Sequence, residues 1–267
     1  MRHGRKLTIA AGVVLATLAG VAAASAAQKT EKGKTRVFML QGGGHDWKLH
    51  FPILAKLLEE TGDFTVSQSE DLNELRPEKI RNYDVVLFYG SGLNFSDPAQ
   101  EQGLCEFVRN GGAFVGIHSA TDSFKNSDAY WELVGGRFAG HGGGSFQVYI
   151  HDKEHSITKD LEDFEIQDET YSHQYHKNAC MRSLIRMNRD TERQSMGWVQ
   201  PYGKGRVFYT SLGHGIEAWK NPQFQRLVVR GIYWAAGREA ARGNRLPRRP
   251  GQIADRDADK AAPSSNP

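Results

Sequence analysis

The sequence has little cysteine and little excess charge. Only two of its 267 residues are cysteines, Cys105 and Cys180, which is too few for a disulfide framework. The two thiols could be buried, or they could pair with each other in an oxidising compartment. The formal net charge is only +3, which excludes the strongly basic surface that is typical of nucleic-acid-binding proteins. We therefore expect no nucleic-acid partner.

Long hydrophobic runs are also missing, except near the N-terminus. There, the basic segment 1–6 precedes the apolar stretch 7–24, which leads into Ala-Ser-Ala. This order predicts a secretory signal peptide over residues 1–26 and export to the periplasm or the cell exterior. The alternative is an uncleaved membrane anchor, since the apolar stretch approaches the roughly 18 residues that a membrane span requires.

The C-terminal segment has almost no large apolar side chains. Residues 238–267 cannot bury enough surface to order themselves, so we predict a disordered and solvated tail. Residues 27–35 form a short linker, and residues 36–237 remain as one α/β domain. No internal repeat or second linker interrupts this domain.

Known phosphate-binding loops are missing as well. Three consecutive glycines, Gly42–Gly44, follow the first apolar run, but neither G-x-x-x-x-G-K-[ST] nor G-x-G-x-x-G is present there. These glycines more simply allow a tight turn and the close approach of a substrate. A second glycine-rich stretch, GHGGGS at 140–145, predicts a flexible loop, with a lid or binding loop as the alternative.

What the sequence does contain is a succession of apolar runs and amphipathic segments. In the first half, apolar runs typical of buried parallel strands alternate with segments of helical periodicity. The expected strands are 35–43, 64–68, 83–90 and 112–118, and the expected helices are 47–62 and 98–108, the second capped by Ser96. The less regular second half predicts strands or edge pieces at 145–150, 164–171, 182–188 and 205–213 and a closing helix at 222–236. This order favours an α/β fold with a doubly wound, mostly parallel sheet and right-handed crossovers.

Polar side chains follow several of these predicted strands directly. His45 comes after the first strand, His118 after the fourth and His214 after the last. Ligands of open α/β sheets bind beyond the carboxyl ends of the strands, near the point where the strand order reverses. We therefore expect the three imidazoles to line one cleft, with Glu169 nearby. The same stretches supply the candidate substrate-binding residues Gly43, Gly44, His45, Asp46, Trp47, Ser119, Asp122 and Tyr171.

The segment GGAFVGIHSATD, residues 111–122, has the form of a nucleophile elbow, a strand that delivers a reactive side chain at its tip. The residue at this tip is His118, which is neither serine nor cysteine. A serine hydrolase that uses Ser119 is one alternative, although the segment does not match G-x-S-x-G.

Five motifs, taken in order, resemble the ThuA-like family, which is named for trehalose utilisation: GGGHDW, GGAFVGIHSATD, HSITKDL, DETY and YGKGRVFYTSLGH. The resemblance covers residues 36–237 and implies the class I glutamine amidotransferase-like fold, a three-layer flavodoxin-like sandwich. Since the elbow of those amidotransferases carries a cysteine and this one carries His118, amidotransferase activity is not expected. The resemblance also implies a role in carbohydrate catabolism, with a sugar or 3-keto sugar as substrate and a sugar oxidoreductase as partner in the same pathway.

The residues leave two kinds of chemistry open for such a substrate. His118, His214 and Glu169 could act as acid and base beside a carbonyl. Alternatively, His45, His118 and His214 could hold a divalent metal and leave one position open for a substrate oxygen.

A third possibility is a non-catalytic module that binds glycans. Such a module would stack aromatic side chains on sugar rings, whereas tryptophans are also used simply for packing in a core. The candidates for stacking are Trp47, Trp198 and Trp219.

Overall fold

The computed structural model describes residues 33–187 and 195–239. The predicted signal peptide, most of the linker and nearly all of the predicted tail lie outside the described residues. Within the described ranges, no helix is long and apolar enough to cross a membrane.

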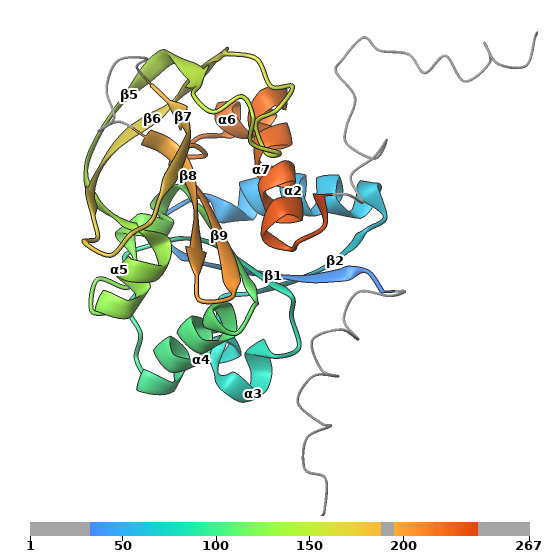
Figure 1. The fold of residues 1–267 in the computed structure, drawn as a ribbon, viewed down its shortest axis with the longest axis vertical. Coiled ribbons are helices and arrows are strands. Elements are labelled where there is room, and N and C mark those ends of the chain that lie inside the picture. The colour runs from blue at the N-terminus through green and yellow to red at the C-terminus, as the bar shows by residue number, and fades with distance from the viewer. Residues whose placement is uncertain (1–32, 188–194, 240–267) are drawn as a thin grey trace, which may run out of the picture. The chain divides into compact units, whose positions relative to one another are not determined.

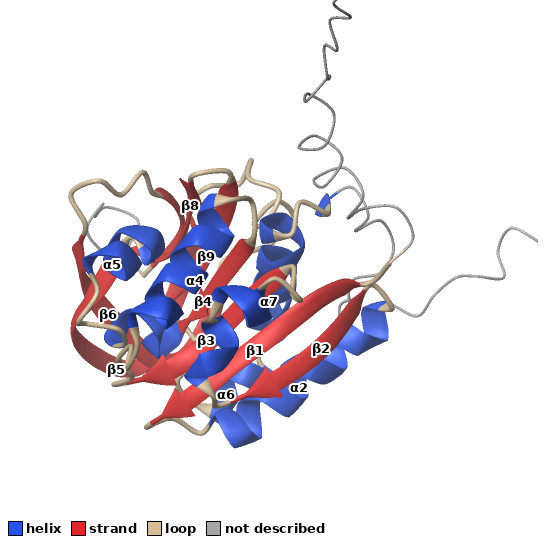
Figure 2. Cartoon of the chain, turned by 90° about the horizontal axis from the view of Figure 1, so that it is seen from below, coloured by secondary structure: helices blue, strands red, loops and turns tan. Residues whose placement is uncertain are grey.

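Five parallel strands form the part of the sheet that was expected from the first half of the sequence and from the last predicted strand. They are β1 (Thr35–Gly43), β2 (Phe64–Ser69), β3 (Val85–Ser91), β4 (Ala113–Ile117) and β9 (Gly205–Thr210). Their order is β2-β1-β3-β4-β9, and all four neighbouring pairs are parallel. Figure 2 shows these strands side by side. This is the flavodoxin-like order, so the predicted fold class is confirmed.

Four further strands extend the sheet in antiparallel pairs, in the order β8-β7-β5-β6 from the edge of β9. They are β5 (Gly136–Ile150), β6 (Phe164–Tyr175), β7 (Arg182–Arg186) and β8 (Ser195–Tyr202). The prediction of a loop at 140–145 is wrong, because this stretch lies inside β5 and pairs along its length with β6. Glycine itself has little strand preference, so the hydrogen bonds to β6 determine the local conformation.

Helices cover both faces of the parallel strands (Figure 1). The helices α2 (Trp47–Thr61), α6 (Ile216–Lys220) and α7 (Pro222–Ala235) share one core with the side chains of Val37 and Met39 of β1. The opposite core contains Phe38 and Leu40 together with α3 (Pro77–Ile80), α4 (Pro98–Arg109), α5 (Asp128–Val134) and the 3₁₀ turn η1 (Leu72–Leu75). Since neighbouring residues of a strand point to opposite faces, a continuous apolar run serves both cores.

The structure corrects one smaller expectation and decides between two open alternatives. The cap of α4 is Asp97 and not Ser96, since an Asp97 carboxylate oxygen accepts the backbone N–H of Ala99 at 2.8 Å. The two cysteines are both free, with Cys105 buried in α4 and Cys180 exposed.

The tryptophans considered for sugar stacking have different environments. Trp198 and Trp219 are fully buried and therefore pack the core, whereas Trp47 is half-buried.

His50 of α2 is a core residue rather than a ligand of the histidine cluster. Its side chain is 1% exposed, lies with its ring stacked on Trp219, and places Nδ1 3.1 Å from the hydroxyl of Tyr89. Burial lowers the pKa of His50 to about 4, because a charged imidazole is poorly solvated there. The folded protein therefore holds this imidazole neutral.

We predict that replacing His50 with Phe makes stability less sensitive to acid. Between pH 6.5 and 4 the unfolded chain binds a proton at His50 that the folded protein excludes, so this residue makes unfolding easier as the pH falls. The expected slope is up to about 1.4 kcal/mol per pH unit. The raised pKa of Asp168, about 6, acts in the opposite direction, but in both proteins alike. Urea unfolding from pH 4.5 to 7 measures the difference, and equal slopes for the two proteins would contradict the assignment.

Candidate functional site

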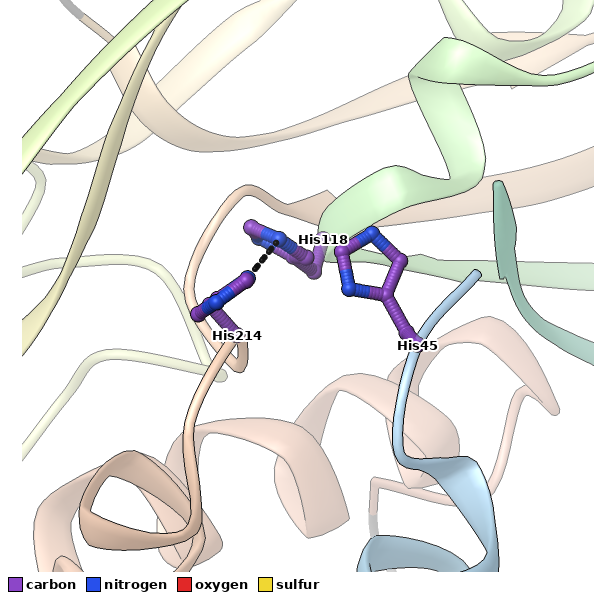
Figure 3. Close-up of side chains that lie close together, drawn as sticks. All are labelled: His45, His118 and His214. Carbon is purple, nitrogen blue, oxygen red and sulfur yellow. Dashed lines mark hydrogen bonds between the residues drawn. The ribbon is translucent and has the colours of Figure 1, made fainter. Parts of the chain in front are cut away.

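Three histidines meet at the carboxyl edge of the parallel sheet. His45 follows β1, His118 follows β4 and His214 follows β9. One ring nitrogen from each lies within 4.8 Å of the other two, and Figure 3 shows the three rings turned toward a common centre. The sequence predicted this meeting because parallel strands place their carboxyl ends at one edge.

The backbone of His118 explains what the elbow does. His118 is one of three non-glycine residues with positive φ in the described part of the chain, and its φ is 47°. This left-handed conformation costs free energy for a residue with a Cβ and is concentrated at functional turns. The hydroxyl of Tyr209 on β9 donates to the His118 carbonyl at 2.7 Å and holds the turn. The elbow thus delivers an imidazole to the strand tip, in the place where other elbows deliver a nucleophile.

The ring of His118 is held in one orientation. It is 0% exposed, and its Nδ1 lies 2.7 Å from the carbonyl oxygen of Ser211. Because a carbonyl can only accept, Nδ1 must carry the hydrogen. Burial lowers the pKa of His118 well below its usual value, so the ring is neutral and Nε2 presents a lone pair.

Several polar atoms crowd around this lone pair. The Tyr171 hydroxyl lies 2.9 Å from His118 Nε2, His214 Nδ1 lies 3.2 Å away, and a Glu169 carboxylate oxygen lies 3.5 Å away. The pKa of the Tyr171 hydroxyl is raised by burial and by Glu169, so it stays protonated and is a donor. One lone pair, a second imidazole and a carboxylate therefore converge on a small volume.

His45 and His214 complete the cluster from the solvent side. The ring of His45 lies edge-on to those of His118 and His214, with centroid distances of 4.9 and 5.2 Å. Burial, and then the neighbouring His214, lower the pKa of His45. The side chain of His214 is 43% exposed, so the cluster is open on this side.

Glu169 on β6 links the cluster to the long antiparallel ribbon. One of its oxygens lies 3.4 Å from His214 Nδ1, and the other lies 3.4 Å from Nδ1 of His141 on β5. Sequence reasoning missed His141, because it belongs to the stretch that was expected to be a loop. No local pattern predicts this contact, which depends on the β5–β6 register, with Gly143 opposite Glu169.

The other predicted substrate-binding residues are spread around the cluster. Gly43 is the exposed last residue of β1, and Gly44 and Asp46 are exposed on the turn before α2. Asp122 is already engaged, since it accepts the Ser91 hydroxyl at 2.8 Å and pairs with Lys125 at 2.6 Å.

Ser119 is 0% exposed, and its Oγ has no hydrogen-bond partner within the ranges that the structure describes. A hydrolytic serine needs a base within hydrogen-bonding reach. The arrangement of Ser119 therefore does not favour a serine hydrolase.

The three histidines of the cluster could hold a divalent transition metal. Neutral imidazoles are the preferred nitrogen ligands of zinc and similar ions, and three of them with an open face match the pattern of catalytic sites. The 3.2 Å between His118 Nε2 and His214 Nδ1 is close to the spacing of about 3.3 Å between two nitrogens that share a tetrahedral zinc. The bond from His118 Nδ1 to the Ser211 carbonyl is the kind of outer contact that orients a metal-binding histidine.

Several solved structures share this fold. A ThuA-like protein from Parabacteroides merdae ATCC 43184 has a TM-score of 0.66 and 21% identity, over 76% of this chain and 90% of that chain. A ThuA-like protein from Bacteroides uniformis ATCC 8492 has a TM-score of 0.60 and 20% identity, over 75% and 91%. A cold-adapted β-galactosidase from Rahnella sp. R3 has a TM-score of 0.57 and 13% identity, and the alignment covers 80% of this chain but 33% of the enzyme. At these identities the likeness shows the fold alone.

Sequence comparison gives the family. A search of curated proteins found no match. The ThuA family model, described as trehalose utilisation, matches residues 34–235, which is the whole α/β domain that contains the histidine cluster. The chain therefore belongs to the ThuA family.

Proposed function

We propose that this chain is an enzyme of carbohydrate catabolism that moves a proton beside the carbonyl of a keto sugar at a divalent-metal site. The observation that carries the proposal is the convergence of His45, His118 and His214, with the His118 Nε2 lone pair fixed toward the centre. The family description, trehalose utilisation, supports a sugar as the substrate class.

The three histidines would hold the ion. A divalent ion at this position would polarise a substrate carbonyl, which favours loss of a proton from the neighbouring carbon. The open side of the cluster, at His214, gives the substrate its access.

Glu169 is the residue that we assign as general base. Its carboxylate takes the proton from the carbon beside the carbonyl, and the electron pair left on that carbon moves into the carbonyl to form an enediolate. For an isomerisation, Glu169 returns the proton to the former carbonyl carbon, while the hydroxyl proton on the neighbouring carbon passes to the former carbonyl oxygen and leaves a new carbonyl behind. For an elimination, the original carbonyl re-forms and a leaving group departs from the carbon next to the one that lost its proton. The Tyr171 hydroxyl is kept protonated by burial and donates to His118 Nε2 when that nitrogen is free. With Nε2 engaged by the ion, the hydroxyl would turn and donate to the oxygen on which negative charge develops.

A glycan-binding module is less well supported. Two of the three tryptophans considered for stacking on a sugar ring, Trp198 and Trp219, are fully buried. The Tyr171 hydroxyl and the Glu169 carboxylate contact the histidine cluster, which suits proton transfer better than passive stacking.

The first prediction concerns the metal. Full-length protein stripped with a chelator and titrated with zinc in a calorimeter should bind one equivalent, and His118→Ala should weaken this binding by about a hundredfold or more, because a ligand is lost. His151→Ala is the control, since His151 lies outside the cluster. Equal zinc affinity for the two variants would contradict the site.

The second prediction concerns the base. In D₂O, the zinc-loaded protein should exchange the hydrogen beside the carbonyl of a 3-keto disaccharide, and NMR measures the rate. Glu169→Gln should slow the exchange by about 10²–10⁴-fold, the usual contribution of a general base. Glu165→Gln alters an exposed carboxylate of the same strand and should leave the rate unchanged. If Glu169→Gln kept the full exchange rate, Glu169 would not be the general base.

Export completes the proposal. It is supported by the basic start, the apolar run and the Ala-Ser-Ala sequence of residues 24–26. Mass spectrometry of the protein from its native cell should find a mature N-terminus at Ala27 or Gln28. A chain that retains Met1 in the cytoplasmic fraction would contradict export.

A further inference from the structure

A buried carboxylate lies beside the histidine cluster. It is neither the proposed general base nor one of the proposed metal ligands. Asp168 precedes Glu169 on β6 and is 7% exposed. One of its oxygens accepts the backbone N–H of Gly213 at 2.6 Å, and the other accepts the backbone N–H of His214 at 2.9 Å. Both oxygens are therefore committed to the backbone of the loop that carries His214.

The same loop is held from its other side. The carbonyl oxygen of Gly213 accepts the indole N–H of Trp219 at 2.8 Å and the hydroxyl of Tyr89 at 3.1 Å. Both of these donors are fully buried. Groups from β6, β3 and α6 thus fix one peptide segment, Gly213–His214, between the end of β9 and the start of α6.

The backbone at Gly213 has a conformation and surroundings that only glycine fits well. Its φ is +116°, which disfavours any residue with a side chain. A Cβ at this position would lie 3.1 Å from side-chain atoms of Ile117 and Phe224. The segment is therefore closely packed against β4 and α7. Its backbone conformation determines where the Cα of His214 lies.

His214 needs such support more than His118 does. His118 is buried and its ring is bonded to Ser211, whereas the His214 side chain is 43% exposed. A partly exposed ligand on a loop loses rotational freedom when it binds a metal, which lowers affinity unless the backbone is already fixed.

We propose that Asp168 is a positioning residue, which fixes the Gly213–His214 backbone so that the His214 imidazole meets His45 and His118 at the cluster. This inference rests on the proposed metal site. Asp168 acts through the loop and touches neither metal nor substrate.

The test compares zinc binding by the full-length wild-type protein and by Asp168→Asn. The asparagine has the same shape but sets an NH₂ group against one of the two backbone N–H groups. Zinc affinity should fall about 10–100-fold, the usual effect of removing an outer contact of a metal site. The matched control is Asp63→Asn, since Asp63 is a buried carboxylate, 6% exposed, that accepts the Tyr233 hydroxyl beside the start of β2. It should change stability and leave zinc affinity unchanged.

A second measurement separates the two proposals. In metal-free protein, NMR correlations of the imidazole nitrogens should show the His214 signals shifted or broadened in Asp168→Asn and those of His155 unchanged. Wild-type protein that binds no zinc refutes the metal site, and the His214 signals then decide whether Asp168 still fixes the loop. Wild-type protein that binds zinc, with equal affinity in Asp168→Asn, refutes the positioning role alone. If Asp168→Asn does not fold, Tyr89→Phe removes a donor from the other side of Gly213 and should weaken zinc binding in the same direction.

Discussion

The hydrogen bond from His118 Nδ1 to the carbonyl of Ser211 is the interaction on which the site depends. It joins the loop after β4 to the loop after β9 at 2.7 Å, and it determines which nitrogen of a buried ring carries the hydrogen. Because Nδ1 is a donor there, Nε2 is left as a lone pair. The parallel pairing of β4 and β9 brings the two loops together, so the topology of the sheet sets the protonation pattern of the imidazole.

The rest of the site is arranged around this lone pair in two layers. Side chains that can bind a metal ion or transfer a proton surround it, namely those of Tyr171, His214, Glu169 and His45. Behind them, buried groups hold backbone: Tyr209 holds the strained elbow, and Asp168 holds the loop of His214. These buried hydrogen bonds hold the backbone, so the reactive side chains stay in place while their own polar atoms remain available for metal or substrate. Such support suits a site that is open to solvent on one side.

The parts of the fold that could be predicted are those with a local signal. A continuous apolar run predicted β1 with the bounds that the structure has, 35–43, and the αL glycine Gly62 ends α2 where the sequence indicated. The three histidines could be expected together because each follows a parallel strand. The ends of the β5–β6 ribbon at 145–150 and 164–171 were expected as strands, but the extension of β5 through residues 136–144 was not, since this glycine-rich stretch has no apolar periodicity and takes its conformation from its partner strand. Strand β8 was also missed. The contact of Asp168 with Gly213, 45 residues further along the chain, likewise leaves no local pattern.

The most direct test of this account is a crystal structure of the full-length protein grown with zinc, with anomalous data collected on both sides of the zinc absorption edge. We expect an anomalous peak at about 2.0–2.1 Å from one nitrogen each of His45, His118 and His214, with His118 binding through Nε2 and Nδ1 still bonded to the Ser211 carbonyl. An empty histidine cluster in protein that holds zinc elsewhere, or a His118 ring turned to bind through Nδ1, would contradict it.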